Sequence, residues 1–359
     1  MDSLIKKENL IQLAEYQKSL YNEPKLRYLF FELTDCCNLN CMHCGSKCTS
    51  SNRNYLDFEL IERTLSSVRR GNDPSEIMIC ITGGEPLLHP DIYKTVYIAR
   101  QMGFSVGITS NGTLIDKKRA EMLVKAGLNT ITISLDGLGD THDKFRCSQG
   151  AFEKAVNGIR FLKQAGIEPQ VLTVVHKNNI SQLEDIYQFL QKEDICSWRL
   201  VNIDPIGRAA TNNSLLLEGE DLKYLFDYIR AKRFDENCVM DVTTGCSHFL
   251  TYEFENEVRD YYFQCGAGTV VASIMANGDI GACLDIERNQ KLIQGNVYRD
   301  DFMDVWQNKF RIFRRDRSDE CEKCRDCKNK NVCLGDSAHT WDFDKDEPYY
   351  CVADMLKEA

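Results

Sequence analysis

Short apolar runs alternate with longer amphipathic stretches through the first 203 residues. Runs of this kind, bounded by turn residues, are typical of buried strands, whereas apolar positions three and four apart indicate helices. The expected strands cover residues 27–33, 76–82, 105–110, 130–135, 170–175 and 197–203. The helices expected between them cover residues 57–69, 91–102, 116–126, 151–165 and 180–192.

Regular alternation of strand and helix implies a parallel sheet with helices on its outside. Six strands are too few for a closed eight-stranded barrel, so we expect an α/β fold with a partial (βα)6 TIM-like barrel. Functional residues of such folds lie on the loops at the C-terminal ends of the strands. A polar loop follows each expected strand here, which predicts a ring-shaped site at one rim.

The pattern differs on both sides of this region. Residues 1–25 are predicted to form an N-terminal helix and linker, and residues 213–240 a helical connector. Between them, residues 26–212 form the expected barrel. From 241 to 359 the alternation gives way to cysteines and turn glycines, which predicts a second, small α+β domain.

Composition narrows the class of protein. Hydrophobic residues make up 43% and charged residues 27%, as in folded domains. The net charge of −10 argues against a nucleic-acid partner. The longest apolar runs are strand-sized and the N-terminus has no apolar signal core, so we expect no membrane partner and a cytoplasmic location.

The 17 cysteines are the most unusual part of the composition. Disulfides are rare in the reducing cytosol, where dense cysteine usually indicates metal ligation or catalysis. Five cysteines fall within residues 36–48 and five within residues 321–351. Clustering of this kind predicts metal sites rather than scattered core thiols.

Cys37, Cys41 and Cys44 follow the first expected strand with the spacing C-x3-C-x2-C. Three neighbouring thiolates can hold three irons of a four-iron cluster and leave the fourth iron open for a non-protein ligand. The spacing also suits a zinc site completed by His43 or Cys48. The position after the first strand, with a glycine loop after the second, favours iron.

This cysteine loop, with the segment Gly83-Gly84-Glu85-Pro86, resembles the radical S-adenosylmethionine (radical SAM) superfamily over about residues 27–208. The resemblance implies reductive cleavage of S-adenosylmethionine (SAM) to a 5′-deoxyadenosyl radical, which removes a hydrogen atom from a substrate. The cofactor-binding residues that it implies are Gly83, Gly84, Glu85, Pro86, Thr109, Asn111, Ser134, Asp136, Arg208 and His43. His43 stands where the family usually has an aromatic residue that packs on the adenine.

A second set of cysteines is similar to the SPASM domain of radical SAM enzymes. The matching positions are Cys265, Gly278, Cys283, Cys321, Cys324, Cys327, Cys333 and Cys351. The resemblance implies two auxiliary [4Fe-4S] clusters, so that the chain would hold three. Cys324, Cys327, Cys333 and Cys351 would bind the outer auxiliary cluster, and Cys265 and Cys283 the inner one. A zinc ribbon is the alternative for paired cysteines.

Ser337 stands where the SPASM pattern has a further cysteine for the inner cluster. Cys246 and Cys321 are the two thiols that could replace it. We expect both to bind the inner cluster and to close it; if either does not, one iron would stay open to substrate.

Most SPASM relatives modify peptides or proteins, so the resemblance implies a maturase that forms a crosslink, thioether or epimer in a ribosomally made peptide. A flavodoxin- or ferredoxin-type protein would donate the electron. The alternatives are an anaerobic sulfatase-maturing enzyme that forms formylglycine, and a small-molecule or tetrapyrrole enzyme. A non-enzymatic electron carrier would leave the glycine loop unexplained.

Two residues are candidates for a catalytic role, Asp285 and Cys36. Sulfatase-maturing relatives carry an aspartate directly after the cysteine that matches Cys283. Here Leu284 intervenes before Asp285, which argues against that activity. A free thiol such as Cys36 or Cys48 could donate a hydrogen atom, as in radical epimerases.

Overall fold

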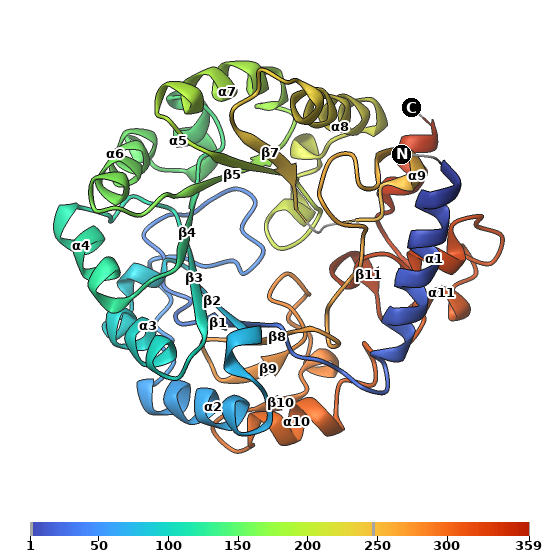
Figure 1. Ribbon diagram of the computed structural model, residues 1–359, viewed down its shortest axis with the longest axis horizontal. Coiled ribbons are helices and arrows are strands. Elements are labelled where there is room, and N and C mark those ends of the chain that lie inside the picture. The colour runs from blue at the N-terminus through green and yellow to red at the C-terminus, as the bar shows by residue number, and fades with distance from the viewer. Residues whose placement is uncertain (1–2, 246–247, 359) are drawn as a thin grey trace.

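The computed structural model describes residues 3–245 and 248–358. Within these residues, ten strands form one curved sheet in the order β10-β9-β8-β1-β2-β3-β4-β5-β6-β7 (Figure 1). The strands are β1 (Tyr28–Glu32), β2 (Met78–Thr82), β3 (Ser105–Ser110), β4 (Thr130–Ser134), β5 (Gln170–Val175), β6 (Ser197–Asn202), β7 (Asp241–Thr244), β8 (Val271–Ile274), β9 (Asp279–Gly281) and β10 (Gly295–Asn296).

Helices cover the outer face of this sheet, as Figure 1 shows for α2 to α4 and α6 to α8. The first eight are α1 (Ser3–Ser19), α2 (Phe58–Gly71), α3 (Ile92–Gln101), α4 (Lys117–Ala126), α5 (Asp140–Arg146), α6 (Ala151–Gln164), α7 (Leu183–Lys192) and α8 (Gly219–Phe234). The rest are short: α9 (Thr251–Phe254), α10 (Phe302–Asn308), α11 (Arg317–Glu320), α12 (Lys330–Cys333) and α13 (Val352–Glu358). The expected α/β fold with a parallel barrel-like sheet is confirmed.

The parallel sheet continues beyond the six strands that the sequence predicted. Strand β7 pairs in parallel with β6, and β8 pairs in parallel with β1 at the opposite end. Both belong to the segment after residue 240, which also adds β9 antiparallel to β8 and β10 antiparallel to β9. The C-terminal segment therefore builds part of the barrel wall.

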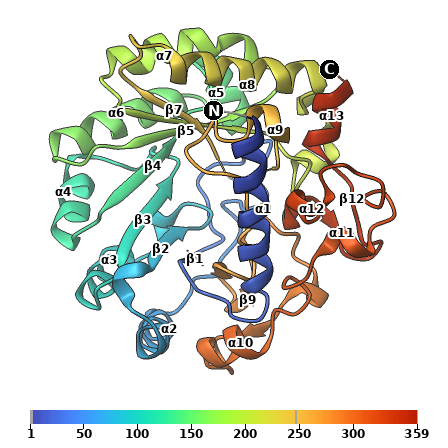
Figure 2. The ribbon, with the colours of Figure 1, turned by 45° about the vertical axis from the view of Figure 1, so that its right-hand side comes forward.

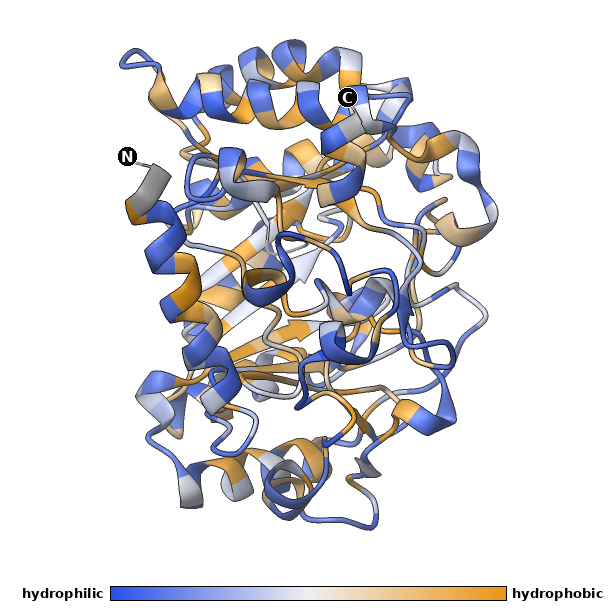
Figure 3. Cartoon of the chain, turned by 90° about the vertical axis from the view of Figure 1, so that its right-hand side faces the viewer, coloured by the Kyte–Doolittle hydropathy of each residue, from blue (hydrophilic) through white to orange (hydrophobic). Residues whose placement is uncertain are grey.

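The core lies between the sheet and its helices, and strand alternation decides which side chains enter it. Trp198 and Leu200 of β6 are fully buried in this core. Arg199 and Val201 on the same strand point to the opposite face and line an internal cavity. Figure 3 shows the apolar residues concentrated on the central strands. Side chains on the inner face of the sheet are therefore available to form a functional site.

Helix α1 packs against the C-terminal segment, beside α12 (Figure 2). Leu10 and Ala14 of α1 are buried, and Gln17 donates a hydrogen bond from its amide to the carbonyl of Cys265 over 3.1 Å. The N-terminal helix therefore supports the cysteine-bearing region. In the part of the chain that the structure describes, no helix combines the length and apolar character needed to cross a membrane.

Candidate active site and cluster-binding cysteines

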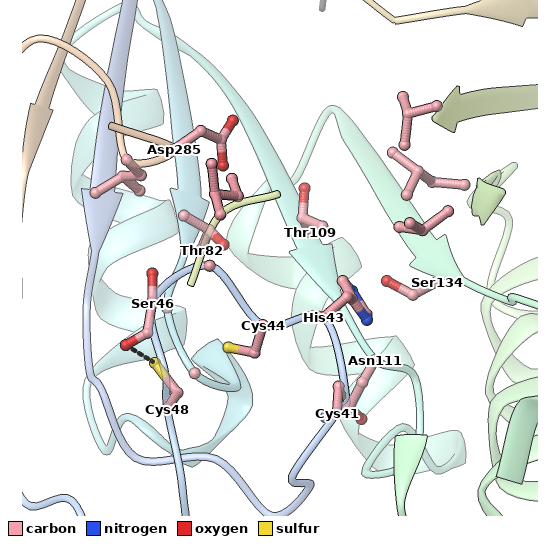
Figure 4. A pocket seen from close by; sticks show the side chains of 18 of the residues that line it. Cys41, His43, Cys44, Ser46, Cys48, Thr82, Thr109, Asn111, Ser134 and Asp285 are labelled. Carbon is pink, nitrogen blue, oxygen red and sulfur yellow. Dashed lines mark hydrogen bonds between the residues drawn. The ribbon is translucent and has the colours of Figure 1, made fainter. Parts of the chain in front are cut away.

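A cavity of about 460 Å³ opens inside the barrel, where the loops after the parallel strands meet (Figure 4). It brings together most of the residues that the sequence predicted for the site. These are Cys37, Cys41, Cys44, His43, Gly83, Gly84, Thr109, Asn111, Ser134, Arg208, Cys283 and Asp285. Loops far apart in the sequence thus share one cavity.

Arg208 holds the cysteine loop in place. Its Nε donates to the carbonyl of Cys41 over 2.6 Å, and Nη1 donates to the carbonyl of Cys48 over 3.1 Å. A Cβ on the neighbouring Gly207 would lie 2.3 Å from the carbonyl oxygen of Cys44, so the close approach requires glycine. Arg208 lines the cavity, and the structure gives its guanidinium a role in fixing the loop.

The three cysteines of the loop do not meet at a single point. Among the described residues, Asp204, His248 and His339 form a set of three metal-ligating side chains whose donor atoms all lie within 4.8 Å of one another, whereas Cys37, Cys41 and Cys44 do not form such a set. Three thiolates that each bind a different iron do not need to meet at one point.

Arg146 is a cavity residue that the sequence did not predict. Its Nη1 lies 3.6 Å from the sulfur of Cys41, and its Nε donates to Oδ2 of Asp136 over 2.5 Å. Burial would raise the pKa of Asp136, but the Arg146 charge outweighs it and the pKa falls to about 2. Asp136 is fully buried and does not line the cavity, so it acts by holding Arg146.

Glu85 also lies in the wall rather than at the cavity. Its carboxylate accepts hydrogen bonds from Ser110 Oγ over 2.9 Å and from the backbone N–H of Asn111 over 2.9 Å. The side chain is completely buried, and Pro86 behind it opens a short 3₁₀ turn. Of the glycine motif, only Gly83 and Gly84 reach the cavity. A Cβ on Gly84 would lie 2.2 Å from the carbonyl oxygen of Cys36.

His43 supplies an aromatic surface to the cavity. Its ring stacks on Phe145 at 4.4 Å between centroids, and Phe145 stacks in turn on His176 at 4.0 Å. Burial lowers the pKa of His43 to about 3, so the imidazole is neutral. Its Nδ1 is buried and has no hydrogen-bond partner among the described residues, which suits a ligand that supplies one.

The two candidate catalytic residues lie in different surroundings. Asp285 faces the cavity, where burial raises the pKa of its carboxyl (Figure 4). Its Oδ2 lies 3.9 Å from the sulfur of Cys283. The thiol of Cys36 instead interacts with the hydroxyl of Tyr55, and Cys36 does not line the cavity.

A polar network that the sequence did not predict joins the barrel to the C-terminal region. Asp204, which follows β6, lies 2.9 Å from Nε2 of His248 and 2.8 Å from Nε2 of His339. The second ring nitrogen of His248 lies 3.0 Å from Asp336. Burial would lower the pKa of His248, but the two carboxylates raise it to about 10. Asp204 and His339 line the same cavity as the cysteine loop.

The outer cysteine set encloses a second cavity of about 710 Å³. Its lining includes Cys324, Cys327, Cys333 and Cys351, a complete set of four thiols for a four-iron cluster. Cys321 is buried, and its thiol forms a hydrogen bond with the thiol of Cys324. Cys321 does not line this cavity. Cys321 thus lies beside the outer cysteine set, and its expected role at the inner cluster stays a prediction.

The inner set is only partly described. Cys283 lines the main cavity, and the sulfur of Cys265 accepts a hydrogen bond from the backbone N–H of Ala338 over 3.4 Å. Cys265 therefore lies next to Ser337, the residue that replaces the missing cysteine. Cys246, the other expected ligand, falls outside the described residues.

Comparisons with known proteins agree with this site. Residues 31–190 match the sequence model of the radical SAM superfamily, and residues 265–328 match SPASM, an iron-sulfur cluster-binding domain. The first match contains the cysteine loop, the glycine segment and Ser134. The second contains Cys265, Cys283, Cys321, Cys324 and Cys327.

Two curated relatives align with most of the chain. The AdoMet-dependent heme synthase of Oleidesulfovibrio alaskensis is 28% identical, over 87% of this chain and 82% of the relative. The mycofactocin maturase MftC of Mycolicibacterium smegmatis is 29% identical, over 86% of this chain and 76% of the relative.

The fold also matches solved structures. SuiB of Streptococcus suis bound to S-adenosylmethionine aligns with a TM-score of 0.72 at 21% identity, covering 87% of this chain and 73% of SuiB. The likeness in fold extends across both the barrel and the C-terminal segment. This chain therefore belongs to the radical SAM superfamily and carries a C-terminal SPASM domain.

Proposed function

We propose that this enzyme uses SAM bound at a four-iron cluster on Cys37, Cys41 and Cys44 to remove a hydrogen atom from one side group of a tetrapyrrole. When bound, the cluster and SAM supply the 5′-deoxyadenosyl radical. Two auxiliary clusters on the SPASM cysteines, and a flavodoxin- or ferredoxin-type electron donor, complete the proposal. The observation that carries it is the cavity that joins the three thiols to the glycine segment.

The chain's own residues would bind and orient the reactants. Arg208 and Arg146 fix the cysteine loop, while Gly83 and Gly84 permit close backbone approach to the methionine end of SAM. The neutral ring of His43 offers a flat surface for the adenine. The barrel wall excludes water from a reactive radical.

Cavity size limits how much of a substrate can enter. A volume of about 460 Å³ lies within the roughly 300–1,000 Å³ of a pocket for one drug-sized ligand. SAM would take up a large part of this space. A substrate as large as a tetrapyrrole would therefore insert one side group and leave the rest of the molecule at the cavity mouth.

The heme synthase relative supports a tetrapyrrole, because the alignment covers most of both chains. A peptide is the second candidate, and the mycofactocin maturase relative, aligned over a similar length, supports it. One peptide side chain would enter the same cavity. The two candidates differ in the molecule outside the cavity, not in the chemistry inside it.

Deuterium transfer tests the proposed substrate. The anaerobically reconstituted enzyme would be incubated with SAM, dithionite and iron coproporphyrin III deuterated on its propionate side chains. We expect deuterium in the 5′-deoxyadenosine and a changed porphyrin mass, both measured by mass spectrometry. Undeuterated 5′-deoxyadenosine together with unchanged porphyrin would contradict a tetrapyrrole substrate.

A further inference from the structure

Arg199 is an arginine on the inner face of the barrel. Its neighbours Trp198 and Leu200 point into the core, and strand alternation turns Arg199 and Val201 toward the cavity that they line. Arg199 is partly exposed there. Arg199 is the one charged side chain of β6; the other five residues of this strand are uncharged.

Several other charged side chains that line this cavity have charged or hydrogen-bonding partners among the described residues. Glu32 pairs with Arg288, Arg146 pairs with Asp136, and Arg208 donates to backbone carbonyls. Within the described residues, the Arg199 guanidinium has no hydrogen bond or ion pair. Burial raises the pKa of the Cys80 thiol, and the charge of Arg199 acts against that rise. In the part of the chain that the structure describes, the guanidinium therefore lacks an anionic partner and faces the cavity.

The surroundings of Arg199 strengthen its attraction for an anion. Leu172 and Val174 of β5 and Val201 of β6 line the same part of the wall. Apolar neighbours lower the local dielectric constant and so increase the attraction between opposite charges. Desolvating a cation without a partner costs free energy, which a bound anion would offset.

We propose that Arg199 binds a carboxylate group of the substrate. The planar guanidinium matches a carboxylate with two parallel hydrogen bonds, which fixes orientation as well as position. This inference rests on the proposed function, because it takes the substrate to enter this cavity. It deepens that function by assigning the substrate class: a molecule whose reacting side group carries, or lies beside, a carboxylate.

SAM has a carboxylate too, so the ligand of Arg199 must be distinguished from the cofactor. Arg199 lies three positions before Asn202, the last residue of β6, whereas Gly83 and Gly84 follow the end of β2. The methionine end of SAM is proposed to lie at the glycine segment. Arg199 is thus placed deeper in the barrel, on a different strand.

Affinities for a matched acid and ester test the assignment. Iron coproporphyrin III and its tetramethyl ester would be titrated into the reconstituted enzyme, its Arg199→Met variant and a control variant, Arg160→Met. Arg160 pairs with Glu193 on the surface, so its replacement removes an arginine elsewhere. Tryptophan fluorescence would report binding, and ultrafiltration would give the dissociation constant for SAM.

We expect the wild type and Arg160→Met to prefer the acid over the ester by roughly 10- to 100-fold, the range for a charged hydrogen bond. Arg199→Met should lose this preference while its affinity for SAM stays within about twofold of wild type. A preference that persists in Arg199→Met would overturn the proposal. If Arg199→Met instead loses affinity for SAM by a factor similar to its loss of preference for the acid, Arg199 binds the methionine carboxylate.

Two further arms keep the test decisive. If the Arg199→Met variant loses its near-ultraviolet circular dichroism signal and is therefore misfolded, the Arg199→Lys variant is measured in its place. Arg199→Lys should show a preference for the acid that is weaker than that of wild type, and a preference equal to wild type would count against two-pronged binding.

If neither porphyrin binds the wild type, the tetrapyrrole proposal fails, and propionate and propionamide are compared by saturation-transfer NMR. Propionate binding that Arg199→Met abolishes would then support the carboxylate site, and equal binding would overturn it.

Discussion

Two arginines fix the cysteine loop through different atoms. Arg208 donates to backbone carbonyls of the loop, whereas Arg146 approaches the sulfur of Cys41 itself. The resemblance to the radical SAM superfamily implied Arg208 as a site residue. Arg146 could not be predicted in this way, because it ends α5, a seven-residue helix that the apolar pattern did not indicate.

Replacing Arg146 should destabilise the fold. In Arg146→Met, the fully buried Asp136 would lose its partner, and such a loss costs about 3–5 kcal/mol. Arg160→Met is the matched control, since its exposed pair with Glu193 is worth about 0–1 kcal/mol. Chemical denaturation of both variants measures the difference. If Arg146→Met and Arg160→Met unfold with equal free energies, the loss of Arg146 does not leave an unpaired buried charge on Asp136, and the prediction is wrong.

The iron content of cysteine variants tests the outer site. Cys324 lines the outer cavity with three other thiols, whereas Cys321 lies outside it. Three clusters would give about twelve iron atoms per chain. We expect Cys324→Ala to lose about four atoms, measured by iron assay and paramagnetic resonance. A Cys324→Ala variant that keeps all its iron would contradict the outer site, and Cys321→Ala tests the predicted inner-cluster ligand by the same measurements.

Among the elements, the parallel strands β1 to β6 follow directly from their apolar runs. The sequence did not predict β7 and β8 as barrel strands. Strand β7 has four residues, Asp241–Thr244, with only one apolar side chain, and β8 is also four residues long. Their pairing with β6 and β1 depends on contacts across the whole chain, which a local pattern does not contain.

This pairing predicts that the barrel needs its C-terminal segment. A chain ending at residue 240 would lose β7 and β8 and expose the edges of β6 and β1. Unpaired edges associate with one another, so we expect aggregation. Size-exclusion chromatography of the truncated and full-length proteins would measure it. A monodisperse truncated protein with native circular dichroism would contradict the account.

In the whole molecule, the barrel and the SPASM segment share the active-site wall. Asp204 from the barrel contacts His339 from the C-terminal segment, and His248 bridges Asp204 to Asp336. The spacing of Cys37, Cys41 and Cys44 predicted the first cysteine site, and the resemblance to the SPASM domain implied the other two sets. The sequence holds no signal for this network, because its members are single residues that only the fold brings together.

The central claim is that Cys37, Cys41 and Cys44 hold the cluster at which SAM is cleaved. The most direct measurement is 5′-deoxyadenosine release by the anaerobically reconstituted protein with SAM and dithionite, quantified by chromatography. We expect release by the wild type and none by the variant with Cys37→Ala, Cys41→Ala and Cys44→Ala. Release by that variant at the wild-type rate would contradict the account.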